Sequence, residues 1–333
     1  MLRAFTIADY GLLRKLDKQT IYLNNQFMLT RGTGAFSRGA LFSPLSAFTG
    51  IYTFICDDRG SRPPIICQAF HLAGSPLGYC ILLAPSTALE SPALAEILEG
   101  VTKELASRGA YSLIAEVEEV HPAFKALRQN GFSIYARQRI WRATKAPAAN
   151  ESDSAWRPAL ERDQFAIHLL RKSLVPGQVQ QIEIERHEPL DGYVLRRQGE
   201  IVAYAEVARG PHGIWVQPFV HLDAEPFDEA LGQLVAGLRP RSNRPVYICL
   251  RSYQDWLQSP LEDLGAHAGP RQVVMARRTS LPLPVEEKRR VAVPNRSAEP
   301  TTPIHVPQPQ ARFAAPQLHV SEWIGYDQTP NYR

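Results

Sequence analysis

The stretch ALRQNGFSIYARQRIWR, residues 126–142, combines the end of a helix, a stop at Gly131 and a strand. Glycine often ends helices because it adopts the left-handed backbone conformation at little cost. The same order returns in PLEDLGAHAGPRQVVMARR, residues 260–278, where Gly265 follows Gly131 by 134 positions. This repetition predicts two copies of one structural unit. Chance similarity between two ordinary α+β domains is the alternative.

The residues before the first copy predict a strand meander and then a helix. Three apolar stretches at 51–56, 65–72 and 77–84 are separated by turn-forming residues, as in antiparallel hairpins. Residues 91–108 place their apolar side chains at helical spacing. A further strand is expected at 110–117, directly before the helix that Gly131 ends.

The residues before the second copy repeat this order. Strands are expected at 192–198, 200–208 and 213–220, where apolar stretches alternate with glycine-containing turns. A helix is expected at 226–238, followed by a strand at 244–251. Both copies therefore have the predicted order meander, helix, strand, helix, strand.

The start of the chain predicts a helix and a loop. Asp9 fits a helix cap, and leucines recur at helical spacing through YGLLRKLDKQTIYL, residues 10–23. The glycine-rich RGTGAFSRG, residues 31–39, lacks the spacing and the preceding strand of a phosphate-binding loop. We expect a connector there, with a substrate-facing loop as the alternative.

Composition divides the chain into four parts. Residues 1–145 and 155–280 are the two predicted domains, and the small polar residues 146–154 form a linker. Residues 281–333 are proline-rich without an apolar period, which predicts a flexible tail. Its end, HVSEWIGYDQTPNYR, is aromatic and is either a docking peptide for a protein partner or a tail with scattered aromatics.

The overall numbers indicate a globular protein. The 333 residues are 44% hydrophobic and 21% charged, with a net charge of +4. No apolar run is long enough to span a membrane, and no basic footprint indicates nucleic-acid binding. The start of the chain lacks the pattern of a signal peptide, so we expect a cytoplasmic protein.

The four cysteines are expected to be buried hydrophobic residues rather than ligands or disulfide partners. All of them lie in apolar stretches and none forms a CxxC pair, namely Cys56, Cys67, Cys80 and Cys249. His221 and Asp223 alternate at a strand end without a third ligand. We therefore predict no metal site.

This order resembles the GNAT fold of the GCN5-related acyl-CoA N-acyltransferases. LRQNGFSIYARQRIW (127–141) is similar to the family's helix end and following strand, and GEIVAYAEV (199–207) to its third strand. The predicted fold class is α+β, with two GNAT-like domains in tandem. Each domain is expected to have a mixed, mostly antiparallel sheet flanked by helices, and a proline-rich tail follows the pair.

The resemblance implies transfer of an acyl group from acetyl-CoA or another acyl-CoA to an amine, on a small molecule or a protein. The alternative is a non-catalytic tandem GNAT-fold scaffold or binding protein. In the family the cofactor's pyrophosphate lies on a glycine-rich turn after the fourth strand, at a helix N-terminus. Leu83 and Ala84 end that strand in the first unit, and the resemblance implies that they bind the cofactor.

Two departures from the family pattern are visible in the sequence. The first turn, LLAPSTALESPALAEI (82–97), has no glycine, and the second carries acidic residues that would compete with a phosphate, namely Asp223, Glu225 and Asp228. Leu127 and Leu261 stand where many members have a tyrosine general acid. Tyr111, Tyr135 or Tyr253 would have to replace it.

Three glutamates are the candidate catalytic residues. Glu116 and Glu118 end a predicted strand on one face, where a carboxylate would deprotonate an amine. Glu206 lies in an apolar strand on the same face as Tyr204, and burial would perturb its carboxyl group. A solvated strand end is the alternative for the first pair, and an exposed surface is the alternative for Glu206.

Overall fold

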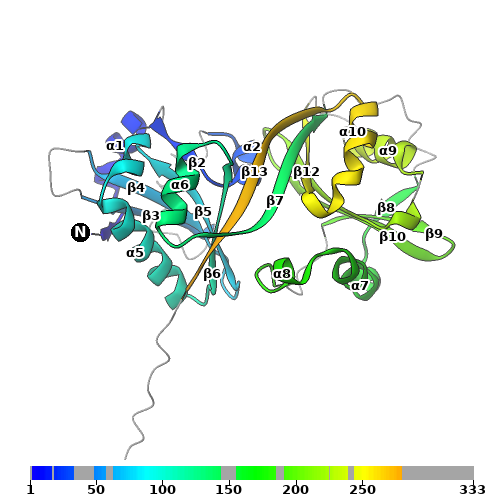
Figure 1. The fold of residues 1–333 in the computed structure, drawn as a ribbon, viewed down its shortest axis with the longest axis horizontal. Coiled ribbons are helices and arrows are strands. Elements are labelled where there is room, and N and C mark those ends of the chain that lie inside the picture. Colours follow the sequence, from blue (N-terminus) through cyan, green and yellow to red (C-terminus); the bar gives the residue numbers. More distant parts are fainter. Residues whose placement is uncertain are drawn as a thin grey trace, which may run out of the picture. The chain divides into compact units, whose positions relative to one another are not determined.

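The computed structural model describes most of the chain up to Thr279. The described residues are 2–16, 19–33, 49–57, 63–143, 155–184, 191–224, 226–238 and 244–279. Within them, thirteen strands form one sheet with helices on its faces (Figure 1). The predicted linker 146–154 and tail 281–333 lie outside the described residues.

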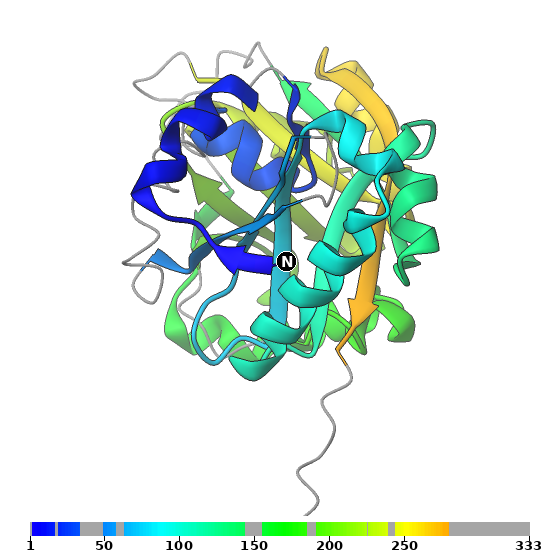
Figure 2. The same ribbon diagram turned by 90° about the vertical axis from the view of Figure 1, so that its left-hand side faces the viewer.

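The first half of the fold, up to residue 143, contains seven strands and their helices. The strands are β1 (Leu2–Ala4), β2 (Ile21–Tyr22), β3 (Ile51–Cys56), β4 (Ile65–Phe70), β5 (Leu77–Ala84), β6 (Ser112–Glu118) and β7 (Ser133–Ala143). The helices are η1 (Ile7–Asp9), α1 (Tyr10–Leu16), α2 (Asn25–Arg31), η4 (Ser86–Glu90), α5 (Ala93–Ser107) and α6 (Pro122–Gln129). Figure 2 shows α1 and α5 on opposite sides of these strands.

The second half, from residue 155, contains six strands and their helices. The strands are β8 (Trp156–Pro158), β9 (Gly192–Arg197), β10 (Glu200–Arg209), β11 (Ile214–Val220), β12 (Val246–Arg251) and β13 (His267–Arg278). The helices are η6 (Glu161–Asp163), α7 (Gln164–Leu174), α8 (Gly177–Gln180), η7 (Leu222–Ala224), α9 (Asp228–Leu238), η8 (Ser252–Leu257) and α10 (Gln258–Asp263).

The two halves have the same strand order. The sheet runs β1-β3-β4-β5-β6-β13-β7-β12-β11-β10-β9-β8, with β2 paired to β5 outside this path. Among the strands of the described residues, only the pairs β5–β6 and β11–β12 are parallel, and both occupy the same place in their half. This is the α+β, tandem arrangement of mixed, mostly antiparallel sheets that the sequence predicts.

The closing strand of each half pairs with the other half. β13 lies between β6 and β7, and β7 lies between β13 and β12 (Figure 1). The apolar side chains of each closing strand pack in the core of the other half. Val273 and Met275 of β13 lie in the core around α5. Trp141 and Ala143 of β7 lie in the core around α9. Each core is thus completed by a strand from the other half.

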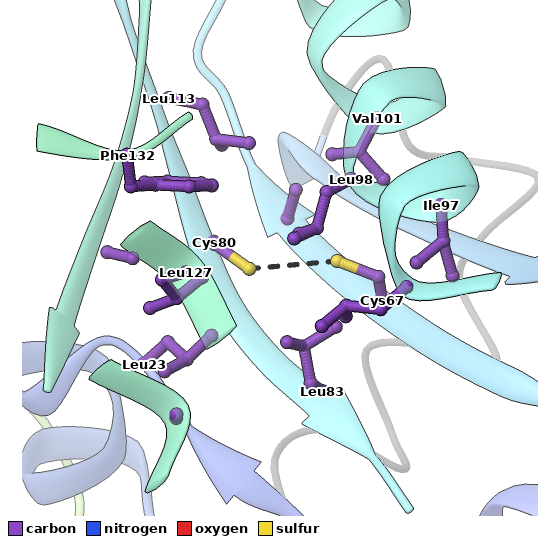
Figure 3. Close-up of a cluster of buried hydrophobic side chains, with 14 of the residues drawn as sticks. Leu23, Cys67, Cys80, Leu83, Ile97, Leu98, Val101, Leu113, Leu127 and Phe132 are labelled. Carbon is purple, nitrogen blue, oxygen red and sulfur yellow. Dashed lines mark hydrogen bonds between the residues drawn. The ribbon is translucent and has the colours of Figure 1, made fainter. Parts of the chain in front are cut away.

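The core around α5, here the first core, is built from the predicted amphipathic helix. Leu94, Ile97, Leu98, Val101 and Leu105 are buried against strands β3 to β6. Figure 3 shows part of this core, in which the sulfur atoms of two buried cysteines in β4 and β5 lie 3.6 Å apart. All four cysteines are buried, as predicted.

An arginine–aspartate ion pair is repeated at the start of each half. The Arg3 guanidinium donates to both carboxylate oxygens of Asp9, at 2.7 and 2.8 Å. Arg157 donates in the same way to Asp163, at 2.6 and 2.7 Å. In both cases the backbone N–H three residues before the aspartate also donates to it, at 2.9 Å. The two halves therefore share a side-chain arrangement as well as a strand order.

The helix predicted over 10–23 is wrong at its end. Helix α1 stops at Leu16, and Ile21 and Tyr22 form a strand. The physical reason is tertiary, because these residues pair with β5 and this pairing outweighs their helical spacing. Helix α2 was not predicted, and most of the glycine-rich loop 31–39 lies outside the described residues.

Candidate functional site

The parallel strands β5 and β6 diverge, and Leu23 lies between them. The two strands pair only where 77–79 meets 112–114. Beyond this point the Leu23 N–H donates to the Ile81 carbonyl at 2.7 Å, and the Glu116 N–H donates to the Leu23 carbonyl at 2.8 Å. Leu23 is fully buried in the first core, close to Leu127 in Figure 3. The cleft of the first half is therefore closed by its own chain.

The same segment occupies the edge of β5 where a cofactor is expected. Ile21 pairs with Leu83, whose side chain is fully buried in the first core. Ala84 pairs with Ile66 on the other side of β5 and is also buried. The two residues predicted to bind the cofactor thus lie in a paired, buried strand.

Glu116 holds the start of α2. Its Oε2 atom accepts from the Asn25 backbone N–H at 2.9 Å and from the Asn25 side-chain amide at 2.7 Å. Glu116 is only 8% exposed, so both of its bonds are shielded from water. The carboxylate therefore lies at the N-terminal end of α2.

A chain of buried polar side chains continues from Glu116 across the exchanged strands. Asn25 donates to the Gln272 side chain at 3.0 Å, and Gln138 donates to the same oxygen at 3.0 Å. The Cys249 thiol donates to the Gln138 oxygen at 3.4 Å. Gln138 and Gln272 lie directly opposite each other on β7 and β13. The halves are thus joined by polar contacts as well as by apolar packing.

The other two candidate glutamates have different surroundings. Glu118 is half-buried at the end of β6, on the same face as Glu116. Glu206 lies on β10, where its side chain is 49% exposed and forms an ion pair with Arg171 at 3.2 Å. Tyr204, two residues earlier on the same strand, is buried under α7, whereas the Glu206 side chain is not buried. The described contacts do not bring Glu206 together with the other two.

Two backbone donors in the turn after β5 are bonded within the turn. The N–H of Ala88 donates to the Pro85 carbonyl, and that of Ser91 donates to the Ala88 carbonyl. At the start of α5 the N–H of Ala93 donates to the Ser91 hydroxyl at 3.2 Å. A phosphate would find these N–H groups already bonded, and the first half does not fit the pyrophosphate of acyl-CoA.

The turn after β11 in the second half is acidic. Asp228 and Glu229 occupy the first turn of α9, and the Asp223 carboxylate lies 3.1 Å from His221 Nδ1. Glu225 lies outside the described residues. Carboxylates complement the helix dipole at the place where a phosphate would lie, so this turn does not fit the pyrophosphate either.

The parallel strands of the second half, β11 and β12, also pair over a short stretch only. β11 and β12 pair only where 214–216 meets 246–248. Beyond this point the Gln254 side chain donates to the Val220 carbonyl at 3.0 Å. Among the described residues, no backbone segment bonds to both strands there as Leu23 does in the first half.

Leucines replace the tyrosine acid in both halves. Leu127 and Leu261 are fully buried in the two cores. Of the tyrosines named as substitutes, Tyr111 is 60% exposed, whereas Tyr135 is 6% exposed and bonded to a carboxylate. Burial, and then the charge of Glu183, raise the pKa of Tyr135, so this phenol keeps its proton.

A charged cluster that the sequence did not indicate lies at the end of β12. Arg251 donates to Glu183 Oε1 at 2.6 Å, and the Tyr135 hydroxyl donates to the same oxygen at 2.7 Å. Tyr253 lies close enough for the charges of Arg251 and Glu183 to affect its pKa, which burial raises. Burial also raises the pKa of Cys249, to about 12. Arg251 is the last residue of an apolar strand, and its contact with Glu183 is visible only in the folded structure.

The described residues contain no group of three or more histidine, cysteine, aspartate or glutamate side chains able to hold a metal ion. Within the same ranges, no helix is long and apolar enough to cross a membrane.

Comparison with known proteins identifies the fold. No family profile and no curated protein matches the sequence. The structure is similar to a GCN5-related N-acetyltransferase from Sphaerobacter thermophilus, at 13% identity and a TM-score of 0.51, over 84% of this chain and 96% of that one. A putative acetyltransferase from Pyrococcus horikoshii is similar at 10% identity and a TM-score of 0.49, over 84% and 89%. The chain has the GNAT fold, which confirms the resemblance seen in the sequence.

Proposed function

We propose that the halves have different roles, the first being structural and the second carrying the binding site. The observation that supports this is the position of Leu23, whose backbone bonds to both diverging strands of the first half. Fold alone does not establish an activity, so the proposal depends on these contacts.

The function that this geometry supports best is ligand binding by a GNAT-fold protein without acyl-CoA. Both turns fail to fit the pyrophosphate, the first through bonded N–H groups and the second through carboxylates. Calorimetric titration with acetyl-CoA and longer acyl-CoAs tests it. We expect no binding at about millimolar ligand, the weakest affinity that such a titration resolves. Saturable binding of any acyl-CoA would contradict the proposal.

The second candidate function is acyl-CoA-dependent N-acyl transfer in the second half. It is favoured by the β11–β12 cleft, which no described backbone segment closes. The acceptor would be an amine on a small molecule or a protein, and Glu206 is the candidate base in this half, whereas Glu116 and Glu118 lie in the first half. Release of free CoA from acetyl-CoA in the presence of an amine mixture tests this candidate. Turnover that persists in the Leu23→Ala variant but disappears when residues between β11 and β12 are substituted would support this candidate.

A partner that binds through the tail 281–333 is a separate proposal, and so is the cytoplasmic location. The aromatic end of the sequence motivates the first of these. Affinity capture with the full chain and with a chain ending at Thr279 tests it, and a partner retained by both chains would contradict it.

A further inference from the structure

Arg251 is a buried guanidinium with unused donors. Its side chain is 8% exposed, and of its three nitrogens only Nη2 has a partner, Glu183 Oε1 at 2.6 Å. Among the described residues, Nε and Nη1 have no hydrogen-bond partner. Buried donors are nearly always bonded, because an unbonded one loses its hydration without compensation. The described residues therefore provide no acceptor for these two N–H groups.

Glu183 gives the cluster a second kind of group and access to solvent. Its Oε1 atom already accepts from both Arg251 and Tyr135, and a carboxylate has further lone pairs for other donors. The Glu183 side chain is 23% exposed, and Tyr79 and Tyr253 beside the cluster are half-buried. A small molecule would reach the cluster from this side.

The charges of the cluster define the ligand. One guanidinium and one carboxylate cancel, so an anion or a cation alone would leave a net charge in a largely buried place. A molecule with both charges would keep the balance, with its carboxylate on the free Arg251 nitrogens and its ammonium group on Glu183. We propose that Arg251 and Glu183 form a binding site for a small zwitterion of the α-amino acid class.

The two charged residues of the site, Arg251 and Glu183, come from the second half, and the Tyr135 hydroxyl comes from the first. Gln138 lies opposite Arg251 on β12, and its counterpart Gln272 lies opposite Glu118 on β6. Arg251 therefore occupies the position in the second half that corresponds to Glu118 in the first half, so the residue at this position is a cation in one half and a carboxylate in the other. The proposal does not depend on acyl-CoA, so it and the proposed function fail separately.

The experiment is an NMR titration of the full chain labelled with ¹⁵N-arginine. The Nε–H signal of Arg251 is assigned by its loss in Arg251→Lys. Glycine, acetate and methylammonium are added separately to about 100 mM, the range of weak binding. We expect glycine to shift this signal with an apparent Kd at least about tenfold below those of the single-charge probes, because two linked contacts reinforce each other.

Two outcomes would overturn the proposal. No shift with any probe would mean that water alone satisfies the Arg251 nitrogens. Equal affinities for glycine and acetate would mean an anion site without a contribution from Glu183.

Glu183→Gln keeps the size of the side chain and tests the second contact. Glycine binding should fall to the level of acetate, and undiminished binding would contradict the proposal. Arg137→Lys is the matched control, because Arg137 forms an exposed ion pair with Glu119 away from the cluster. This variant should bind glycine as the unaltered chain does. Thermal unfolding of every variant shows whether the fold is retained.

Discussion

In the first half a backbone segment bonds to both parallel strands, whereas among the described residues of the second half the Gln254 side chain bonds to β11. The strands and the ion pair at the start of each half are otherwise repeated. The two halves therefore share one strand arrangement and differ in the groups that bond to their parallel strands. Glu116 and Cys249, like Glu118 and Arg251, occupy corresponding positions with different chemistry.

The largest expected effect is that of Leu23→Ala. Loss of a fully buried leucine side chain from the first core should lower the free energy of unfolding by about 2–5 kcal/mol, measured by urea denaturation. Val175→Ala is the matched control, because Val175 precedes α8 by two residues as Leu23 precedes α2. Val175 is half-buried, and its loss should be about 1 kcal/mol. Equal losses of unfolding free energy in the two variants would mean that Leu23 stabilises the protein no more than Val175 does.

Glu116→Ala should have the next largest effect. It leaves two donors of Asn25 without an acceptor in a buried place, which should cost about 1–3 kcal/mol. Glu116→Gln keeps one acceptor oxygen and should cost less. Urea denaturation of both variants gives the comparison. A Glu116→Gln protein with full stability but no acyl transfer would show instead that Glu116 is a catalytic base.

The repeated ion pair predicts a similar acid sensitivity in both halves. Hydrogen bonds from Arg157, and also that of the Leu160 N–H, lower the pKa of Asp163 to about 2 against the opposing effect of burial. The pKa of Asp9 is lowered for the same reason, with Arg3 as donor. A lowered carboxyl pKa gives stability that is complete above the unfolded pKa of about 4 and is lost as the pH falls toward the folded value.

Asp163→Asn should therefore cost about 1–2 kcal/mol at pH 7, after allowance for the partial exposure of Arg157. The difference from the unaltered chain should shrink between about pH 4 and pH 2, measured by urea denaturation across this range. Asp9→Asn should lose less, since Arg3 is 40% exposed. A large loss in only one half would mean that the two ion pairs are not equivalent.

The smallest effect is expected for Glu206→Gln. Its ion pair with Arg171 is half exposed, and such pairs contribute about 0.5 kcal/mol or less. The unfolding midpoint should hardly change. If acyl transfer is detected and this variant abolishes it at unchanged stability, Glu206 acts in the reaction, and the second half contains the catalytic base.

The sequence was sufficient for the repeated elements because their patterns are local. The helix over 91–108 and the stops at Gly131 and Gly265 depend on apolar spacing and on the left-handed backbone of glycine. Both glycines have positive φ values in the structure, 83° and 72°. These features were predicted to within a few residues.

The site was not predictable because it depends on non-local contacts. Ile21 to Leu23 continue a helical spacing, and only their pairing with β5 and β6 shows that they fill a cleft. Arg251 ends an apolar strand, and its partner Glu183 lies 68 residues away in the sequence. No local pattern connects two such residues. The exchange of β7 and β13 was missed for the same reason.

That exchange has a consequence for synthesis of the chain. The first core lacks Val273 and Met275 until the ribosome has released β13, near the end of the described fold. The first half therefore waits, with apolar surface uncovered, while the second half is made, although domains generally fold in the order in which they emerge. Neither half is expected to fold alone if the polypeptide is divided between residues 143 and 155.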